Sequence, residues 1–162
     1  MLPVDVTVSL ASISQKDVLA NLMQLYLYDT SEYVDANVNS CGVFETSELE
    51  PYRVVSNRYP YLFTVADQLA GFALLSEPNE HVYELTEFFI LRSMRRRGIG
   101  RAAANQLFTL FPGAWHIGHD ERNVSAQRFW KRTIDSFTLG KFEQSISNDS
   151  TMRLEYYFTA KR

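Results

Sequence analysis

The order of apolar and polar positions in the first third of the chain predicts a strand, a helix and a loop. Residues 4–10 alternate apolar with small or acidic side chains, which indicates a first strand. Ser14 and Asp17 resemble a capping box, and apolar residues follow at helical spacing to about Tyr28, so a helix is expected there. Those apolar residues are Val18, Leu22, Leu25 and Tyr26. Residues 29–49 are polar and irregular, so we expect a loop with a short second helix.

Three strands are predicted in the middle of the chain. Residues 61–66 and 69–76 are rich in β-prone side chains, and only Asp67 and Gln68 separate them, which is the spacing of a two-residue hairpin. Residues 81–91 form a third run of this kind. The first two strands are therefore expected to be antiparallel neighbours.

The last third of the chain alternates helices and strands. A helix is predicted over residues 98–111, because an apolar stripe accompanies consecutive alanines, and Pro112 and Gly113 end it. A short strand over 114–117 and a helix over 124–134 follow. Two final strands are expected over residues 137–146 and 152–159. The order predicts an α/β (α+β) fold, with a mixed sheet of about six or seven strands and about four flanking helices.

Composition favours one domain over residues 1–162, because 46% hydrophobic residues suffice for a single core. The one cysteine, Cys41, excludes an internal disulfide and a cysteine-rich metal site, so we expect a cytoplasmic protein without a metal. The first ten residues lack the features of a signal peptide, and no apolar run approaches the roughly 20 residues that cross a bilayer. No membrane partner is expected. A net charge of −3 disfavours nucleic acid, so any anion site must be local.

A local cluster of positive charge lies where a predicted strand gives way to a predicted helix. Five of the twelve arginines fall between Arg92 and Arg101, with no acidic residue among them. Because a helix N-terminus already carries partial positive charge, this placement is unfavourable unless an anion compensates. Gly98 and Gly100 allow backbone N–H groups to approach a ligand, and such donors together with guanidinium groups suit a pyrophosphate. The alternative is an exposed basic turn, which would make a nucleic-acid contact.

These residues resemble the phosphate loop of the GNAT superfamily of acetyltransferases. That loop has Gln or Arg, two residues, Gly, one residue, and then Gly or Ala, and Arg95, Gly98 and Gly100 stand at those positions. The next pattern of the family is Asn, two residues, Ala, two residues, an aromatic residue or Leu, and then a Tyr-like residue, and residues 123–130 fit it. The match is concentrated between residues 83 and 134. This part of the chain resembles a branch of predicted small acetyltransferases.

The resemblance implies a mostly antiparallel GNAT-like sheet with one splayed pair of strands, formed by the strand ending near Leu91 and the strand at 114–117. Acetyl-CoA is the implied co-substrate, and its pantetheine arm would bond the backbone of about residues 89–91 as an added strand does. The implied cofactor-binding residues are Phe89, Ile90, Leu91, Arg95, Arg96, Arg97, Gly98, Ile99, Gly100, Arg101, Asn123, Phe129 and Trp130. Core packing explains the apolar members equally well, and helix capping is the favoured role for Asn123. A bulky residue at Gly100 is expected to weaken CoA binding with little loss of fold.

Amine acetylation requires removal of an ammonium proton, so a base is expected near the thioester. Glu84 and Glu87 are the candidate catalytic residues. Counted back from Arg95, Glu84 lies where several members of the family place a general base, which slightly favours Glu84. The two glutamates should face opposite sides of their strand unless a bulge intervenes. A solvated or salt-bridged role is the alternative for either. His116 is a weaker candidate, for which core packing is expected.

Two further features bear on the reaction. Trp130 stands where many family members have a tyrosine that protonates the departing thiolate, and an indole N–H does not serve as an acid at neutral pH. Solvent or another tyrosine would then act, or catalysis is lost. The acidic and aromatic segment from Tyr26 to Asp35 suggests a cationic acceptor, so Tyr26, Asp29 and Glu32 are the predicted substrate-binding residues. A solvated acidic loop is the alternative.

The leading hypothesis is therefore an acetyl-CoA-dependent N-acetyltransferase that moves an acetyl group directly to a primary amine of a small, cationic acceptor. A non-catalytic acyl-CoA-binding or sensing module and a protein N-acetyltransferase are the alternatives. A homodimer is left open, and nucleic acid is not an expected partner.

Overall fold

In the computed structural model, which describes residues 4–46 and 49–161, the described strands form a seven-stranded sheet. Its strand order is β1-β2-β3-β4-β5-β7-β6. Neighbouring strands are antiparallel except β4 and β5, which are parallel. The strands are β1 (Thr7–Leu10), β2 (Arg58–Val65), β3 (Gln68–Asn79), β4 (Val82–Ile90), β5 (Gly113–Asp120), β6 (Phe142–Ile146) and β7 (Arg153–Ala160). The predicted mixed, mostly antiparallel sheet is confirmed.

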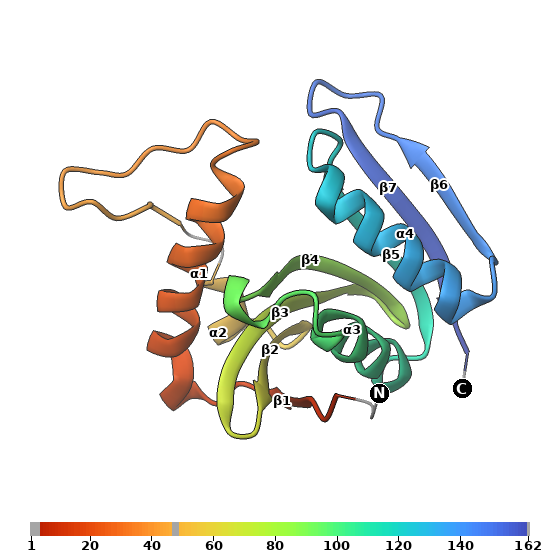
Figure 1. The fold of residues 1–162 in the computed structure, drawn as a ribbon, viewed down its shortest axis with the longest axis horizontal. Coiled ribbons are helices and arrows are strands. Elements are labelled where there is room, and N and C mark those ends of the chain that lie inside the picture. The colour runs from red at the N-terminus through yellow and green to blue at the C-terminus, as the bar shows by residue number, and fades with distance from the viewer. Residues whose placement is uncertain (1–3, 47–48, 162) are drawn as a thin grey trace.

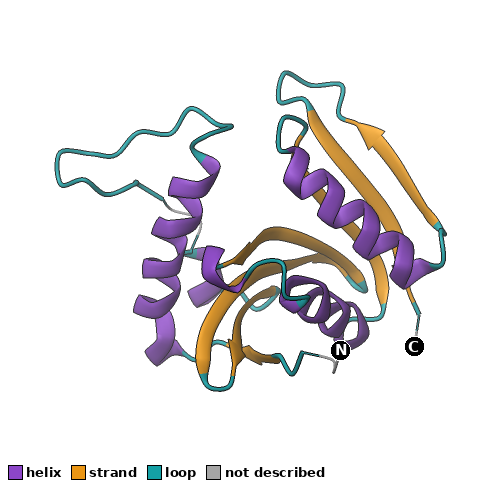
Figure 2. Ribbon diagram, in the orientation of Figure 1, coloured by secondary structure: helices purple, strands orange, loops and turns teal. Residues whose placement is uncertain are grey.

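Helices lie on both faces of this sheet (Figures 1 and 2). The long helices are α1 (Lys16–Thr30), α3 (Ile99–Leu110) and α4 (Val124–Thr138), and α2 (Pro51–Val54) is a single turn. Two 3₁₀ turns, η1 (Ile13–Gln15) and η2 (Arg92–Met94), precede α1 and α3. Figure 1 shows α4 lying along β5 and β7, whereas α1 stands at the opposite end of the sheet.

Alternation along the central strands creates two hydrophobic cores. Phe63 and Trp115 belong to the larger core, which α3 and α4 cover. Leu62, Phe72 and Met23 belong to a smaller core beneath α1. Each large side chain buried in this way stabilises the fold by roughly 1.5–3 kcal/mol. The sheet therefore has an α3/α4 face and an α1 face, and both faces are anchored.

The prediction for the end of the last helix was wrong. The helix was expected to stop at residue 134 with a strand from 137, but α4 continues to Thr138 and β6 begins only at Phe142. Phe137 continues the helical stripe and packs on Phe108 with ring centroids 5.0 Å apart. The helix ends where Leu139 and Gly140 take left-handed φ angles of 53° and 78°.

Other boundaries also differ from the sequence prediction. The β2–β3 turn consists of Ala66 and Asp67, both with positive φ, instead of Asp67 and Gln68. The capping contact at the first helical turn comes from Ser12, whose N–H donates to Gln15 Oε1 at 2.9 Å, two residues before the expected cap. The short second helix lies at residues 51–54, after the expected loop, of which Ser47 and Glu48 lie outside the described residues.

Candidate active site

The parallel pair β4–β5 is short and then separates. Residues 82–85 pair with residues 114–117, and the ladder ends there although both strands continue. Figure 1 shows β4 curving away while β5 continues along β7. Beyond Leu85 and Ile117 the facing backbone edges of the two strands are therefore not paired with each other, as the predicted splay requires.

The backbone groups that face the splay follow from the β3–β4 ladder. Leu91 N–H donates to Ala70 O at 2.8 Å, so Leu91 directs its polar groups toward β3. Because the backbone direction alternates along a strand, Phe89 also faces β3, whereas Ile90 faces the splay. Ile90 O accepts a hydrogen bond from Arg95 Nε at 2.8 Å. Phe89, Ile90 and Leu91 were the residues predicted to bond the pantetheine arm through their backbone. Of these three, only Ile90 directs its N–H at the opening.

A β-bulge in β4 decides where the two candidate glutamates lie. Leu74 pairs with Glu87 but Leu75 pairs with Leu85, so Thr86 is an extra residue. Its Oγ1 donates to Leu74 O at 3.0 Å and is hydrogen-bonded to the Tyr52 hydroxyl of α2. The bulge shifts the alternation by one residue, and Glu84 and Glu87 consequently share the α1 face.

Glu84 is held between a buried serine and a histidine. Its Oε2 accepts a hydrogen bond from Ser76 Oγ on β3 at 3.5 Å. Its Oε1 lies 3.8 Å from His116 Nδ1 on β5. Glu87, which is nearer the phosphate loop along β4, is only partly exposed. Both carboxylates therefore lie beside the splay.

His116 is not a packed core residue, so that expectation was wrong. It lies on the α1 face, its side chain is 31% exposed, and its Nε2 is hydrogen-bonded to Glu155 Oε2 on β7. The Tyr157 ring stacks on the imidazole with centroids 4.7 Å apart. Sequence reasoning missed Glu155 and Tyr157, because only the adjacency of β5 and β7 places them beside His116.

The arginine-glycine loop forms a donor-rich start to α3. Arg96 and Gly98 have positive φ angles of 61° and 79°, which turn the chain into the helix. The first intrahelical bond runs from Ala102 N–H to Gly98 O at 3.0 Å, so the N–H groups of residues 99–101 are not used within the helix. The side chains of Arg96, Arg97 and Arg101 are exposed. This donor set fits a pyrophosphate.

Gly100 lies on the packed side of this turn. A Cβ placed on Gly100 would lie 3.1 Å from the Phe129 ring and 3.4 Å from Ile90 Cγ1. The expectation that a bulky residue here would enter the phosphate site and spare the fold is therefore wrong. Such a residue would push α3 away from α4 and β4.

The N-terminal part of α4 supplies an aromatic wall beside β4. Phe129 stacks on Phe88 at 5.7 Å, and Trp130, 5% exposed, meets Phe88 edge-on at 4.9 Å. Asn123 Oδ1 accepts a hydrogen bond from Ala126 N–H at 2.9 Å, which confirms its capping role. Contact of these residues with CoA stays a prediction. Burial raises the pKa of Tyr156 to about 12, so this tyrosine is a weak proton donor at neutral pH.

Asp29, one of the predicted substrate-binding residues, clamps two arginines of the loop. Its Oδ1 accepts from Arg92 Nε at 2.7 Å, and its Oδ2 is paired with Arg95. Burial raises the pKa of the Asp29 carboxyl, but hydrogen bonds from Arg95 and Arg92 outweigh burial and hold that pKa below its usual value. Tyr26 packs edge-on against Phe72 in the smaller core. Glu32 is exposed, and no structural observation places any of the three against an acceptor.

The Asp29 clamp predicts a pH-dependent stability. Because its pKa is lowered in the folded state, the ionised carboxylate stabilises the fold at neutral pH, and this contribution is lost as pH falls through the folded-state pKa. Asp29→Asn is expected to lower the melting temperature at pH 7 by roughly 2–4 °C, for a partly exposed pair worth about 1 kcal/mol. The difference from the parent protein should shrink below about pH 4. Thermal melts between about pH 3 and pH 8 measure it, and a constant difference across that range would contradict the clamp.

Two loops flank the open end of the splay on the α1 face. An Arg122 Nη2 group, after β5, donates to the Tyr33 carbonyl oxygen after α1. Asp120 holds the same guanidinium at 2.7 Å. Figure 1 shows the loop after α1 reaching toward the β5–α4 turn. The α1 side of the splay is therefore bordered by residues from both halves of the chain.

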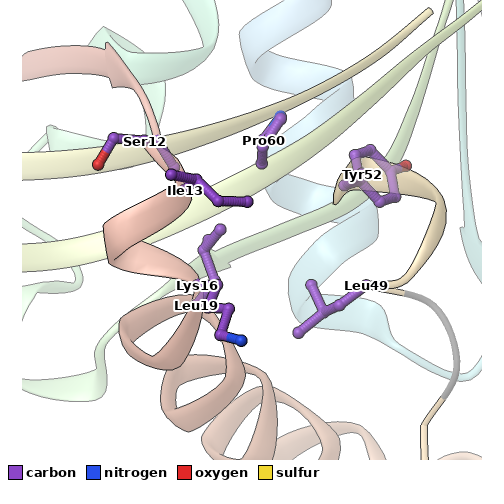
Figure 3. Close-up of a pocket in the computed structure, with 8 residues that line it drawn as sticks. Ser12, Ile13, Lys16, Leu19, Leu49, Tyr52 and Pro60 are labelled. Carbon is purple, nitrogen blue, oxygen red and sulfur yellow. The ribbon is translucent and has the colours of Figure 1, made fainter. Parts of the chain in front are cut away.

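A cavity of about 220 Å³ lies on the α1 face over β2, at the start of α1 (Figure 3). Its lining includes Lys16, Tyr52 and Pro60. Tyr52 also bonds Thr86, so the cavity adjoins the bulge without containing the candidate catalytic residues. Within residues 4–46 and 49–161, no group of three or more metal-ligating side chains is assembled. In the same part of the chain, no helix is long and apolar enough to span a membrane.

A splayed parallel pair beside a basic, glycine-containing helix start is the arrangement expected of a CoA-dependent acyltransferase. A sequence model described as the acetyltransferase (GNAT) family matches residues 23–134. The chain therefore belongs to the GNAT family of N-acetyltransferases, which use acetyl-CoA. No curated protein matches the sequence.

Solved structures share the fold at low identity. An acetyltransferase from Thermus thermophilus is 14% identical with a TM-score of 0.71, over 98% of this chain and 99% of that chain. The Escherichia coli ribosomal-protein-S18-alanine N-acetyltransferase is 12% identical with a TM-score of 0.66, over 98% and 96%. Vibrio cholerae spermidine N-acetyltransferase, in complex with CoA and spermine, is 11% identical with a TM-score of 0.67, over 96% and 95%. These likenesses establish the fold, and the acceptor has to be argued from the site.

Proposed function

We propose that this protein transfers the acetyl group of acetyl-CoA directly to a primary amine of a small, cationic acceptor, within one domain that spans the chain. The observation that carries the proposal is the position of Glu84 and Glu87 on the same face of β4, beside the splay. The helix start that suits pyrophosphate belongs to α3, which covers the other face. Donor and acceptor would then approach the splay from opposite faces, which suits direct transfer in a ternary complex.

The charge of the α1 face supports a cationic acceptor. Glu84, Glu87 and Glu155 lie on this face beside the splay, with Arg153 3.5 Å from Glu155, and at the border of the splay Arg122 is paired with Asp120. An ammonium group is attracted to such a face, whereas an acidic acceptor is repelled. Among structural neighbours, one acts on spermidine and another on the alanine of ribosomal protein S18, so the fold serves small and protein acceptors.

Purified protein assayed with acetyl-CoA against a panel of amines tests the proposal. We expect thiol release with polyamines and other cationic amines, and weak release with neutral or acidic ones. CoA should raise the melting temperature. Stabilisation by CoA without turnover on any amine would favour the acyl-CoA-binding alternative, and turnover limited to peptide N-termini would favour the protein acetyltransferase.

The two carboxylates are expected to contribute unequally. Glu84→Gln should reduce kcat/KM about 100-fold and Glu87→Gln about 10-fold, because Glu84 lies directly beside the point of separation, where a carboxylate holds the ammonium in place for the loss of its proton. Both losses should grow as pH falls, since more of the acceptor is then protonated. Steady-state kinetics from about pH 6 to 9 measure this, with Glu143→Gln on the exposed strand β6 as the matched control. Two variants with unchanged turnover would remove both glutamates from the reaction.

A further inference from the structure

Three strands bring together a histidine and two glutamates on the α1 face. Glu84 and His116 are partners in the short β4–β5 ladder, one residue before the pair Leu85–Ile117 at which the strands separate. Glu155 comes from β7 and is hydrogen-bonded to His116 Nε2. The side chains are 43%, 31% and 10% exposed for Glu84, His116 and Glu155. The cluster is therefore shielded on the β7 side and open beside the splay.

The Glu155 contact selects one tautomer of His116. A carboxylate only accepts hydrogen bonds, so the proton of the neutral imidazole lies on Nε2, which donates to Glu155 Oε2. Nδ1 then carries the lone pair, and Nδ1 is the nitrogen that lies 3.8 Å from Glu84 Oε1. A base held by a third group through its other nitrogen is the arrangement expected of a proton acceptor in a site.

The backbone makes room for this arrangement. A Cβ placed on Gly118 of β5 would lie 2.3 Å from Glu155 Oε2 and 2.9 Å from its Cδ, so any larger residue displaces the carboxylate. Glycine within a strand weakens it, and a close approach is the usual reason for its presence. Arg153 Nε lies 3.5 Å from the other Glu155 oxygen, and Tyr157 stacks within 8° of the imidazole plane. The position and the ring plane of His116 are thus both constrained, and the Glu155 contact favours the Nε2-protonated tautomer.

We propose that His116 Nδ1 is the catalytic base of this enzyme and that Glu84 binds the acceptor ammonium beside it. Glu155 is then a positioning residue, for which Gly118 leaves room because it has no side chain. The proposal rests on the proposed function. The 3.8 Å between Nδ1 and Glu84 Oε1 lets one ammonium nitrogen lie about 2.8–2.9 Å from both atoms, as the apex of a triangle.

The step balances without a further reactant. One N–H bond of the ammonium breaks and its proton forms an Nδ1–H bond, giving an imidazolium that Glu155 stabilises. The free amine attacks the thioester carbonyl carbon, so a C–N bond forms, and the C–S bond breaks with its electron pair leaving on sulfur. A second amine proton neutralises the thiolate through solvent. His116 returns its proton to water through its exposed edge.

The tautomer can be tested without an acceptor. The chain has three histidines, so ¹⁵N-labelled imidazole signals can be assigned by substituting each in turn. We expect His116 to be protonated at Nε2 with Nδ1 unprotonated at the alkaline end of its titration. Gly118→Ala and Glu155→Gln should abolish this preference, with Glu143→Gln as the control. An Nδ1-protonated tautomer, or a signal that Gly118→Ala does not move, would overturn the proposal.

Turnover with spermidine as the probe tests the role of His116. His116→Gln is expected to reduce kcat about 100-fold at pH 7 and less than about 10-fold near pH 10, where the probe supplies free amine without a base. Glu155→Gln and Gly118→Ala should show the same pH-dependent loss at about 10-fold. The charged and titratable neighbours of His116 are Glu84, Glu155, Tyr157 and Arg153. The pH profile of turnover for each variant is therefore compared with the profile of Glu84→Gln. The exposed His81→Gln is the matched control.

The outcomes separate this inference from the proposed function. If wild-type protein fails to acetylate spermidine but shows the expected tautomer, the proposed acceptor class is wrong and the His116–Glu155 pair stands. If turnover is normal and His116→Gln loses the same factor at every pH, His116 is structural and the inference is wrong. CoA affinity should be unchanged and the melting temperature should fall by less than about 4 °C in all of these variants, which excludes a folding defect.

Discussion

Gly71→Ala is expected to destabilise the fold by about 3 kcal/mol, the upper range for overpacking, which lowers the melting temperature by roughly 6–12 °C. Gly71 lies on β3 opposite Ile90 of β4. A Cβ at this position would lie 1.9 Å from Phe89 O and 3.1 Å from Ile90 Cα. Both obstacles are backbone atoms of a paired strand, so they cannot move without breaking the β3–β4 ladder. Chemical and thermal unfolding measure the loss.

Gly118→Ala is the matched control for this prediction. It is also a glycine in a central strand, but the obstructing atoms belong to the end of the Glu155 side chain, which can rotate away. We expect it to change the free energy of unfolding by less than about 1 kcal/mol. Equal melting temperatures for the two variants would contradict the assignment of Gly71 to close backbone contact. Because Gly71 faces the end of β4, its variant should also weaken CoA binding.

The elements predicted best from sequence are those whose signals are local. The basic, glycine-containing turn is a contiguous run, and its placement between a strand and a helix needed only hydrophobic periodicity on either side. The Asn123 cap likewise depends on a residue three positions away. The end of α4 was missed because Phe137 fits either a strand or a helical stripe, and only packing on Phe108 decides between them.

The parts of the site that could not be predicted depend on strand order and register. The last two strands do not follow chain order in the sheet, since β7 lies between β5 and β6, and this places Glu155 beside His116 across 39 positions of sequence. The bulge at Thr86 depends on Tyr52 and Leu74, which no local pattern around Glu84 reveals. The ion pairs of Asp29 are likewise hidden from the sequence, because its arginine partners are 63 and 66 positions away.

Replacing both Arg96 and Arg97 with glutamate is expected to raise the Kd for CoA about 1000-fold. Both side chains are exposed on the loop that precedes α3, where they add charge to the free N–H groups of the first helical turn. Hydrogen bonds to a charged group contribute about 1.5–3 kcal/mol each, so two losses and the added repulsion amount to about three factors of ten. The residual affinity should depend less steeply on salt than that of the parent protein. Isothermal calorimetry at two salt concentrations measures both effects.

Arg92 and Arg95 are left intact in this double variant because they bind Asp29 and support the loop. The melting temperature without CoA should therefore change little. Lys16→Glu together with Lys141→Glu changes the net charge by the same amount at exposed sites on other elements, and its CoA affinity should be near that of the parent protein. If the two double variants weaken CoA equally, the effect comes from net charge. The diphosphate would then not lie against the start of α3, and the basic turn would lose its functional assignment.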